Sequence, residues 1–86
     1  MGAILVTVKF FATLRKATGV KSYESSAASV GAVLKEIEKG YGEDAHRHMK
    51  NCNILVNGRN IGYLKGKRTR LNDGDEVSIF PPLAGG

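Results

Sequence analysis

One stretch of the chain repeats its apolar residues with the period of a helix, and strand-like patterns lie on both sides of it. Val30, Val33, Leu34 and Ile37 fall at positions i, i+3, i+4 and i+7, on one stripe of an amphipathic helix. Such a stripe needs an apolar sheet face against which to bury itself. A chain of 86 residues has room for one domain and one core. We therefore expect a single helix packed across one sheet.

The expected ends of this helix carry residues with suitable cap chemistry. Ser29 stands just before the stripe, where its hydroxyl can accept a hydrogen bond from a backbone N–H group of the first turn. Gly40 follows the stripe and suits the left-handed conformation that ends many helices. Residues 43–50 are polar and irregular, so at most one short helical turn is expected there.

The segments before the helix read as two strands and a loop. Residues 3–11 alternate strictly, with one apolar face formed by Ile4, Val6, Val8 and Phe10. Residues 12–19 break this pattern and end at Gly19, so we expect a loop. Residues 20–25 resume an extended pattern that can pair back onto the first strand as a hairpin.

The segments after the helix predict a hairpin and a last strand. Asn57-Gly58 is the strongest short-range signal for a two-residue hairpin turn. Asp73-Gly74 marks another tight turn, where Asp and Gly are expected for backbone reasons. In the final strand, Val77 and Ile79 fall on the side of the helix.

This order of elements places the first and last strands side by side, joined by a right-handed crossover through the helix. The predicted fold class is α+β, the β-grasp or ubiquitin-like arrangement. It has a mixed four- to five-stranded sheet with one main helix packed across it. We expect a β-grasp domain over residues 1–80 and a flexible Gly-Gly tail over residues 81–86.

Composition and charge limit the classes of partner that the chain is expected to bind. The formal net charge is +5, and the densest basic stretch is Lys65–Arg70. A solvated loop is the favoured reading, followed by an acidic protein partner; nucleic acid ranks last because aromatic stacking residues are scarce nearby. No apolar run approaches the ~20 residues of a membrane span. A single cysteine fits a reducing compartment, so a cytoplasmic location is expected.

No side chains of the chain form a recognisable catalytic or metal site. Cys52 lacks a fixed activating group and reads as a small, half-buried residue. His46 and His48 are two residues apart and lack further ligands, so they read as surface histidines. We expect no metal and no cofactor bound by this chain.

The tail is the remaining candidate. Pro81-Pro82 cannot continue strand pairing and lead the chain stiffly off the sheet. Gly85-Gly86 lack side chains and form a thin, adaptable end that can enter another protein's active site. Its carboxylate is unreactive until it is converted to a mixed anhydride with AMP, which a sulfur or amine nucleophile can then attack.

A family resemblance is carried by the order of elements and by three stretches, "VKFFATLRKATG", "NG" and "LNDGDEVSIFPPLAGG". The sequence resembles the MoaD/ThiS sulfur-carrier family, closest to the small subunit of molybdopterin synthase. The resemblance covers essentially the whole chain. It implies that Gly86 is adenylated by a ubiquitin-activating-enzyme-like (MoeB-like) enzyme with ATP, then thiocarboxylated from a sulfur donor. Sulfur would pass to a pyranopterin precursor in the large (MoaE-like) subunit during molybdenum or tungsten cofactor synthesis. The chain would be a non-catalytic sulfur-donor subunit without nucleic-acid or membrane partners. The tail-threading residues would be Pro81, Pro82, Leu83, Ala84 and Gly85.

Strand parity adds a partner-binding prediction. Phe80 should point to the outer sheet face, and Phe11 has the same parity on the neighbouring first strand. Two exposed aromatic rings would form a docking patch, unless either ring folds over the sheet edge. Three alternatives remain open for the chain: a ubiquitin-like modifier joined to lysines through Gly86, a sulfur carrier for thiamine or tRNA thiolation, or a binding module with an incidental tail.

Overall fold

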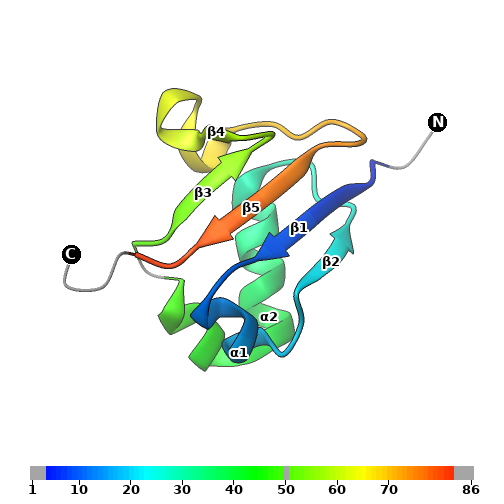
Figure 1. Cartoon of the computed structure of the whole chain (residues 1–86). Helices are drawn as coiled ribbons and strands as arrows, with labels where there is room; N and C mark the ends of the chain where they lie inside the picture. Colours follow the sequence, from blue (N-terminus) through cyan, green and yellow to red (C-terminus); the bar gives the residue numbers. More distant parts are fainter. Residues whose placement is uncertain (1–3, 50, 83–86) are drawn as a thin grey trace.

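The computed structural model describes residues 4–49 and 51–82 (Figure 1). Along these described residues, five strands, two helices and two short 3₁₀ turns follow one another. In order they are β1 (Val6–Phe10), α1 (Thr13–Thr18), β2 (Ser22–Ser25), α2 (Val30–His48), β3 (Asn53–Val56), β4 (Arg59–Asn60), η1 (Ile61–Tyr63), η2 (Gly66–Arg68) and β5 (Glu76–Phe80).

The five strands form one mixed sheet in the order β2-β1-β5-β3-β4. β1 and β5, the first and last strands, lie side by side and parallel, with Phe10 opposite Ile79. The other three neighbouring pairs are antiparallel. α2 crosses one face of this sheet (Figure 1). The β-grasp prediction is therefore confirmed, with five strands.

The core lies between α2 and this face of the sheet. Val6, Val8 and Phe10 of β1 have no exposed surface, and neither do Val77 and Ile79 of β5. The facing residues of the helix are buried to the same degree: Val30, Val33 and Ile37. Full burial of such a side chain contributes about 1.5–3 kcal/mol. Leu34, the fourth residue of the predicted stripe, is only partly buried and packs at the side of the core.

The loop expected over residues 12–19 is in fact mostly helical. α1 spans Thr13–Thr18 and ends at Gly19, whose φ of 81° is left-handed and whose N–H donates to the Arg15 carbonyl. The helix is held in place because Leu14 is fully buried against the core. One buried leucine in a six-residue element is too little periodicity to be recognised in the sequence.

α2 begins as predicted and ends later than predicted. The Ser29 hydroxyl accepts a hydrogen bond from the Ala32 N–H at 3.2 Å, which confirms the N-cap. Gly40 does not end the helix. The break comes at Gly42, with φ 85° and ψ −176°, and helical structure then resumes to His48. The segment after the kink is anchored because Ala45 and Met49 are buried in the core.

Two tight turns lie at the end of the sheet that is farther from the tail. Asn57 and Gly58 both have positive φ, 52° and 84°, which confirms the two-residue hairpin turn between β3 and β4. Gly74 has φ 88°, and the Asp75 N–H donates to the Asn72 carbonyl across the turn before β5. Within the described ranges, no helix is long and apolar enough to cross a membrane.

Candidate functional site

The tail leaves the sheet at the end of β5. Phe80 is the last residue of this strand and lies opposite Asn53 of β3. Pro81 follows and is partly buried, and Pro82 is exposed. The remaining predicted tail residues, Leu83, Ala84, Gly85 and Gly86, lie outside the described residues, so their predicted roles stay predictions.

The rings of Phe11 and Phe80 are stacked directly before the tail. Their centroids are 4.3 Å apart and their planes differ by 10°. The Phe11 N–H donates to the Ile79 carbonyl at 3.1 Å, so the parallel register of β1 and β5 continues one residue beyond β1. Because Ile79 points into the core, its neighbour Phe80 points to the opposite, outer face of the sheet.

Both rings are partly buried, whereas the sequence predicted two exposed rings. They shield one another by stacking, and the guanidinium of Arg15 lies 5.5 Å from the Phe11 ring centroid. At this distance the cation is attracted to the face of the ring. Neither ring is fully exposed to solvent, but together the two rings form one aromatic surface at the base of the tail.

Arg15 is the residue of this site that sequence reasoning missed. Its Nε donates to the Phe10 carbonyl at 2.9 Å, which anchors the guanidinium beside Phe11. The side chain is positioned by α1, an element that the sequence pattern did not predict. No local signal pointed to this contact, because Phe11 lies before α1 and is not on the same helical face as Arg15.

Further cations surround the aromatic pair. A shallow hollow of about 210 Å³ beside Phe11 is lined by Lys9, Arg15 and Lys21, among others. The Lys9 ammonium forms an ion pair with Glu76 at 3.0 Å, with both side chains nearly half exposed. The surface at the base of the tail is therefore aromatic in the middle, with positive charge from Arg15 and Lys21 beside Phe11, which favours a partner with acidic groups around an apolar patch.

The other candidate groups do not form a site. Cys52 is half-buried, and its burial raises the pKa of the thiol, a shift that the nearby Lys67 ammonium only partly opposes. His48 is exposed near the end of α2. In the described part of the chain, no three His, Cys, Asp or Glu residues lie close enough together to hold a metal ion.

The acidic residues of the "DGDE" motif serve the fold. The Asp73 carboxylate accepts from the Leu5 N–H at 2.9 Å, and the Asp75 carboxylate accepts from the Asn72 N–H at 2.7 Å. These bonds tie the turn before β5 to the beginning of β1 and to itself. The prediction of a backbone role for Asp73 is confirmed.

The sequence pattern of the ThiS family matches residues 8–86, which is most of the chain and includes the segment after β5. The chain belongs to the ThiS family. It is a ubiquitin-like chain of the ThiS/MoaD sulfur carriers and small modifiers, and the family resemblance seen in the sequence is confirmed.

Two relatives of this ThiS-family chain are similar over nearly their full length. Small archaeal modifier protein 3 of Haloferax volcanii is 42% identical over 88 residues, covering 92% of this chain and 96% of the relative. Sulfur carrier protein CysO of Mycobacterium tuberculosis is 35% identical over 91 residues, covering 94% and 98%. Sulfur carriers and modifiers are therefore both found among its relatives.

Solved structures agree with this assignment. The small archaeal modifier protein SAMP1 of Methanosarcina acetivorans superimposes with a TM-score of 0.85 at 33% identity, over all of both chains. A putative molybdopterin converting factor, subunit 1, of Pyrococcus furiosus gives 0.71 at 32% identity, covering 93% of this chain and 99% of that one. A chain of the BexX/CysO complex of Amycolatopsis orientalis gives 0.79 at 31%, covering 94% and 99%. Members of this family thus occur in complexes with partner proteins.

Proposed function

We propose that this chain is the sulfur-donating small subunit of a molybdopterin synthase and that Gly86 carries the sulfur. The observation that supports this most directly is the aromatic and basic surface at the base of the tail, formed around Phe11 and Phe80. A surface there can hold a partner while the last residues reach its active site. The match of the family pattern through residue 86 and the similarity to the Pyrococcus furiosus chain add support.

The proposed chemistry activates the Gly86 carboxylate in two steps. A carboxylate oxygen attacks the α-phosphorus of ATP in an adenylating enzyme, pyrophosphate leaves, and a glycyl adenylate forms. A hydrosulfide equivalent from a sulfur donor then attacks the acyl carbon, and AMP leaves with its bonding electrons. The product is a thiocarboxylate. In the synthase its sulfur passes to a pyranopterin precursor, and water restores the carboxylate at the acyl carbon.

The described residues contribute docking rather than catalysis to this scheme. ATP binds to the adenylating enzyme, and the groups that act on the precursor belong to the large subunit. Phe11, Phe80 and Arg15 would contact each partner in turn, because one aromatic surface adjoins the only segment that enters both active sites. Pro81, with its fixed φ, would set the direction in which the tail leaves the sheet. The dependence on ATP agrees with a cytoplasmic setting.

The experiment that tests this proposal measures the mass of the chain after incubation with a MoeB-type activating enzyme, ATP and a sulfide source. The expected result is a mass increase equal to the exchange of one oxygen for sulfur, located by fragmentation at Gly86. A variant that lacks Gly85 and Gly86 is the matched control and should remain unchanged. The modified chain should then form molybdopterin with a MoaE-type large subunit. A chain that acquires thiocarboxylate but forms no molybdopterin would contradict the synthase role and leave sulfur transfer in another pathway.

A second function is favoured by a specific observation, the 42% identity to small archaeal modifier protein 3. In this alternative, a lysine amine of a target protein attacks the same adenylate and forms an isopeptide bond with Gly86. Enrichment of the chain from cells, followed by peptide mapping, would detect Gly86 joined to lysine side chains. Absence of such branched peptides would dismiss the alternative, and their presence together with thiocarboxylate would assign both fates to one activated end.

A further inference from the structure

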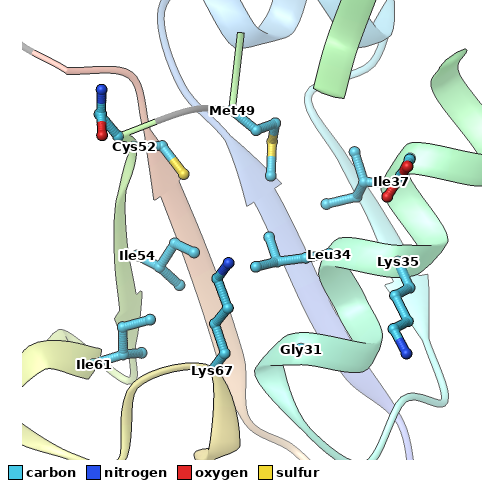
Figure 2. Close-up of a pocket in the computed structure, with 11 residues that line it drawn as sticks. Gly31, Leu34, Lys35, Ile37, Met49, Cys52, Ile54, Ile61 and Lys67 are labelled. Atoms are coloured by element: carbon cyan, nitrogen blue, oxygen red, sulfur yellow. The ribbon is translucent and has the colours of Figure 1, made fainter. Parts of the chain in front are cut away.

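A groove lies on the helix side of the sheet, away from the aromatic pair. It runs between α2 and β3 and has a volume of about 630 Å³ (Figure 2). Its lining is largely apolar: Leu34, Ile37, Met49, Cys52, Ile54 and Ile61. Ile37, Met49 and Ile54 belong to the buried core, whereas Leu34, Cys52 and Ile61 are only partly buried. The core is thus left incompletely covered along this line.

One end of the groove is closed by backbone. A Cβ atom at Gly31 of α2 would lie 3.1 Å from the Lys67 carbonyl oxygen of η2, so the helix and the 3₁₀ turn are nearly in contact there. The Lys67 side chain then rises from this end between Leu34 and Ile54 (Figure 2). Lys67 is exposed to solvent, and its ammonium-bearing side chain lies beside apolar residues of the groove.

Among the side chains that the structure describes, no carboxylate forms an ion pair with Lys67. Its ammonium lies near the Cys52 thiol, whose pKa it lowers in part against the larger effect of burial. Lys35 and Glu38 of α2 also line the groove, on the opposite wall. An ammonium beside apolar side chains gains most from an anionic partner when that partner also excludes water.

The loop beside the groove adds more positive charge. Lys65 and Arg68 flank Lys67 and are exposed, and Arg70 follows at the bridge to Ser29. Tyr63 of η1 is 86% exposed. Tyr and Arg are the residue types that protein interfaces favour. Lys67 is the residue of the basic stretch 65–70 that lines the groove, and the other basic residues of the stretch add positive charge nearby in the sequence.

The register of the sheet favours an extended occupant. β4 pairs with Leu55 and Val56 of β3, but the pairing includes neither Asn53 nor Ile54. Along the described part of the chain, no strand pairs with these two residues on that side; η1 packs against β3 there and covers part of this edge. Such a strand edge is a place where an extended segment of another protein can lie.

We propose that this groove binds an extended segment of a partner protein, with apolar side chains over Leu34 and Ile54 and a carboxylate on Lys67. Because Ile54 faces α2 and Phe80 faces the outer side of the sheet, the groove partner and the partner at the tail base contact opposite faces. The groove is thus a second interface that goes beyond the proposed sulfur-carrier function and does not depend on it.

The test uses the full-length chain and a short synthetic peptide whose alternating Leu, Ile and Val residues are flanked by Glu at both ends. The matched control peptide has Gln in place of every Glu. In an NMR titration, the Glu peptide should shift the amide signals of Leu34, Ile54 and Ile61 and leave those of Phe11 and Phe80 in place. The Gln peptide should bind about tenfold more weakly, and added salt should weaken only the Glu peptide.

Two variants with equal charge change make the test specific. Lys67→Glu should reduce the affinity of the Glu peptide by at least about tenfold, because attraction becomes repulsion. Lys16→Glu, on α1 and outside the groove lining, should leave the affinity unchanged. Unfolding curves of both variants establish that the fold is intact. Equal binding of both peptides, shifts confined to the Phe11 and Phe80 face, self-association through the groove, or no binding at millimolar peptide would each overturn the proposal.

Discussion

The side chains of Asn57 and Asp75 are joined by a hydrogen bond, with the Asn57 Nδ2 donating to the Asp75 Oδ1 at 2.9 Å. The Asn57 Oδ1 accepts in turn from the Glu76 N–H at 2.9 Å, and the Asn57 N–H donates to the Glu76 carbonyl. The hairpin turn between β3 and β4 and the turn before β5 therefore form one hydrogen-bonded unit. Asn57 is both a turn residue and the link between the two turns.

Substitution of Asn57 should separate these two roles. Asn57→Gly removes the two side-chain bonds but tolerates the positive φ, so the free energy of unfolding should fall by about 1–2 kcal/mol. Asn57→Ala should cost roughly 1 kcal/mol more, because alanine is strained at positive φ. Urea denaturation measures both values. Equal loss in the two variants would mean that backbone conformation contributes nothing at this turn.

The glycines of α2 should respond in opposite directions to alanine. Gly31→Ala should lower the free energy of unfolding by about 1 kcal/mol, because the new methyl group would press against the Lys67 carbonyl oxygen. Gly40→Ala should raise it by about 0.5–1 kcal/mol, since Gly40 is helical with nothing within 4 Å of an added Cβ. Thermal denaturation of both variants decides this. A stabilising Gly31→Ala would show that η2 moves away from the helix at little cost.

The Tyr23 hydroxyl should make stability depend on alkaline pH. Burial, together with its hydrogen bond to the Glu36 carboxylate at 2.9 Å, raises the pKa of Tyr23 above its ordinary value. The folded state therefore favours the neutral phenol, and this stabilisation is present below about pH 10 and is lost as the pH rises further.

The matched variant for this prediction is Tyr23→Phe. Its free energy of unfolding should fall less steeply above about pH 10 than that of the wild type, and it should be about 1 kcal/mol less stable at neutral pH. Denaturation at a series of pH values measures both effects. Parallel curves for the two proteins would show that Tyr23 ionises equally in the folded and unfolded states.

The Cys52 thiol should react slowly at neutral pH. Its pKa is raised by burial, so the fraction present as thiolate is smaller than for a free cysteine, and the thiolate is the nucleophile. Alkylation followed by mass spectrometry should be about tenfold slower in the folded chain than in denaturant. Lys67→Met should slow it further, because the ammonium lowers this pKa. Faster alkylation of Lys67→Met would instead indicate that Lys67 mainly blocks access.

The stacked aromatic pair should matter more for binding than for folding. Phe80→Ala should weaken the complex with a MoaE-type large subunit by at least about tenfold, because aromatic anchors dominate interface energies. Phe80→Leu keeps much of the apolar area and should lose less. A double-mutant cycle of Phe11 and Phe80 should give a coupling of about 0.5–1.5 kcal/mol in unfolding. Titration calorimetry with unchanged affinity for Phe80→Ala would remove Phe80 from the interface.

The sequence by itself determined the order of the strands and of the main helix, the buried side of the first and last strands, and the hairpin turn. These features depend on local periodicity and on the few residues that tolerate positive φ, so they can be predicted without knowledge of the tertiary structure. The face of Phe80 followed from parity with Ile79, and the Ser29 cap followed from its position before the helical stripe.

Only the tertiary structure decided the features that depend on contacts between distant segments. α1 is stable because Leu14 is buried in the core. Helical structure continues past Gly40 because Ala45 and Met49 are also buried there. The closeness of Arg15 to Phe11 depends on that unexpected helix. The groove depends on where η2 meets α2, residues that are more than thirty positions apart in the chain. Burial free energy from such long-range packing overrides local propensity, and no short window of sequence contains it.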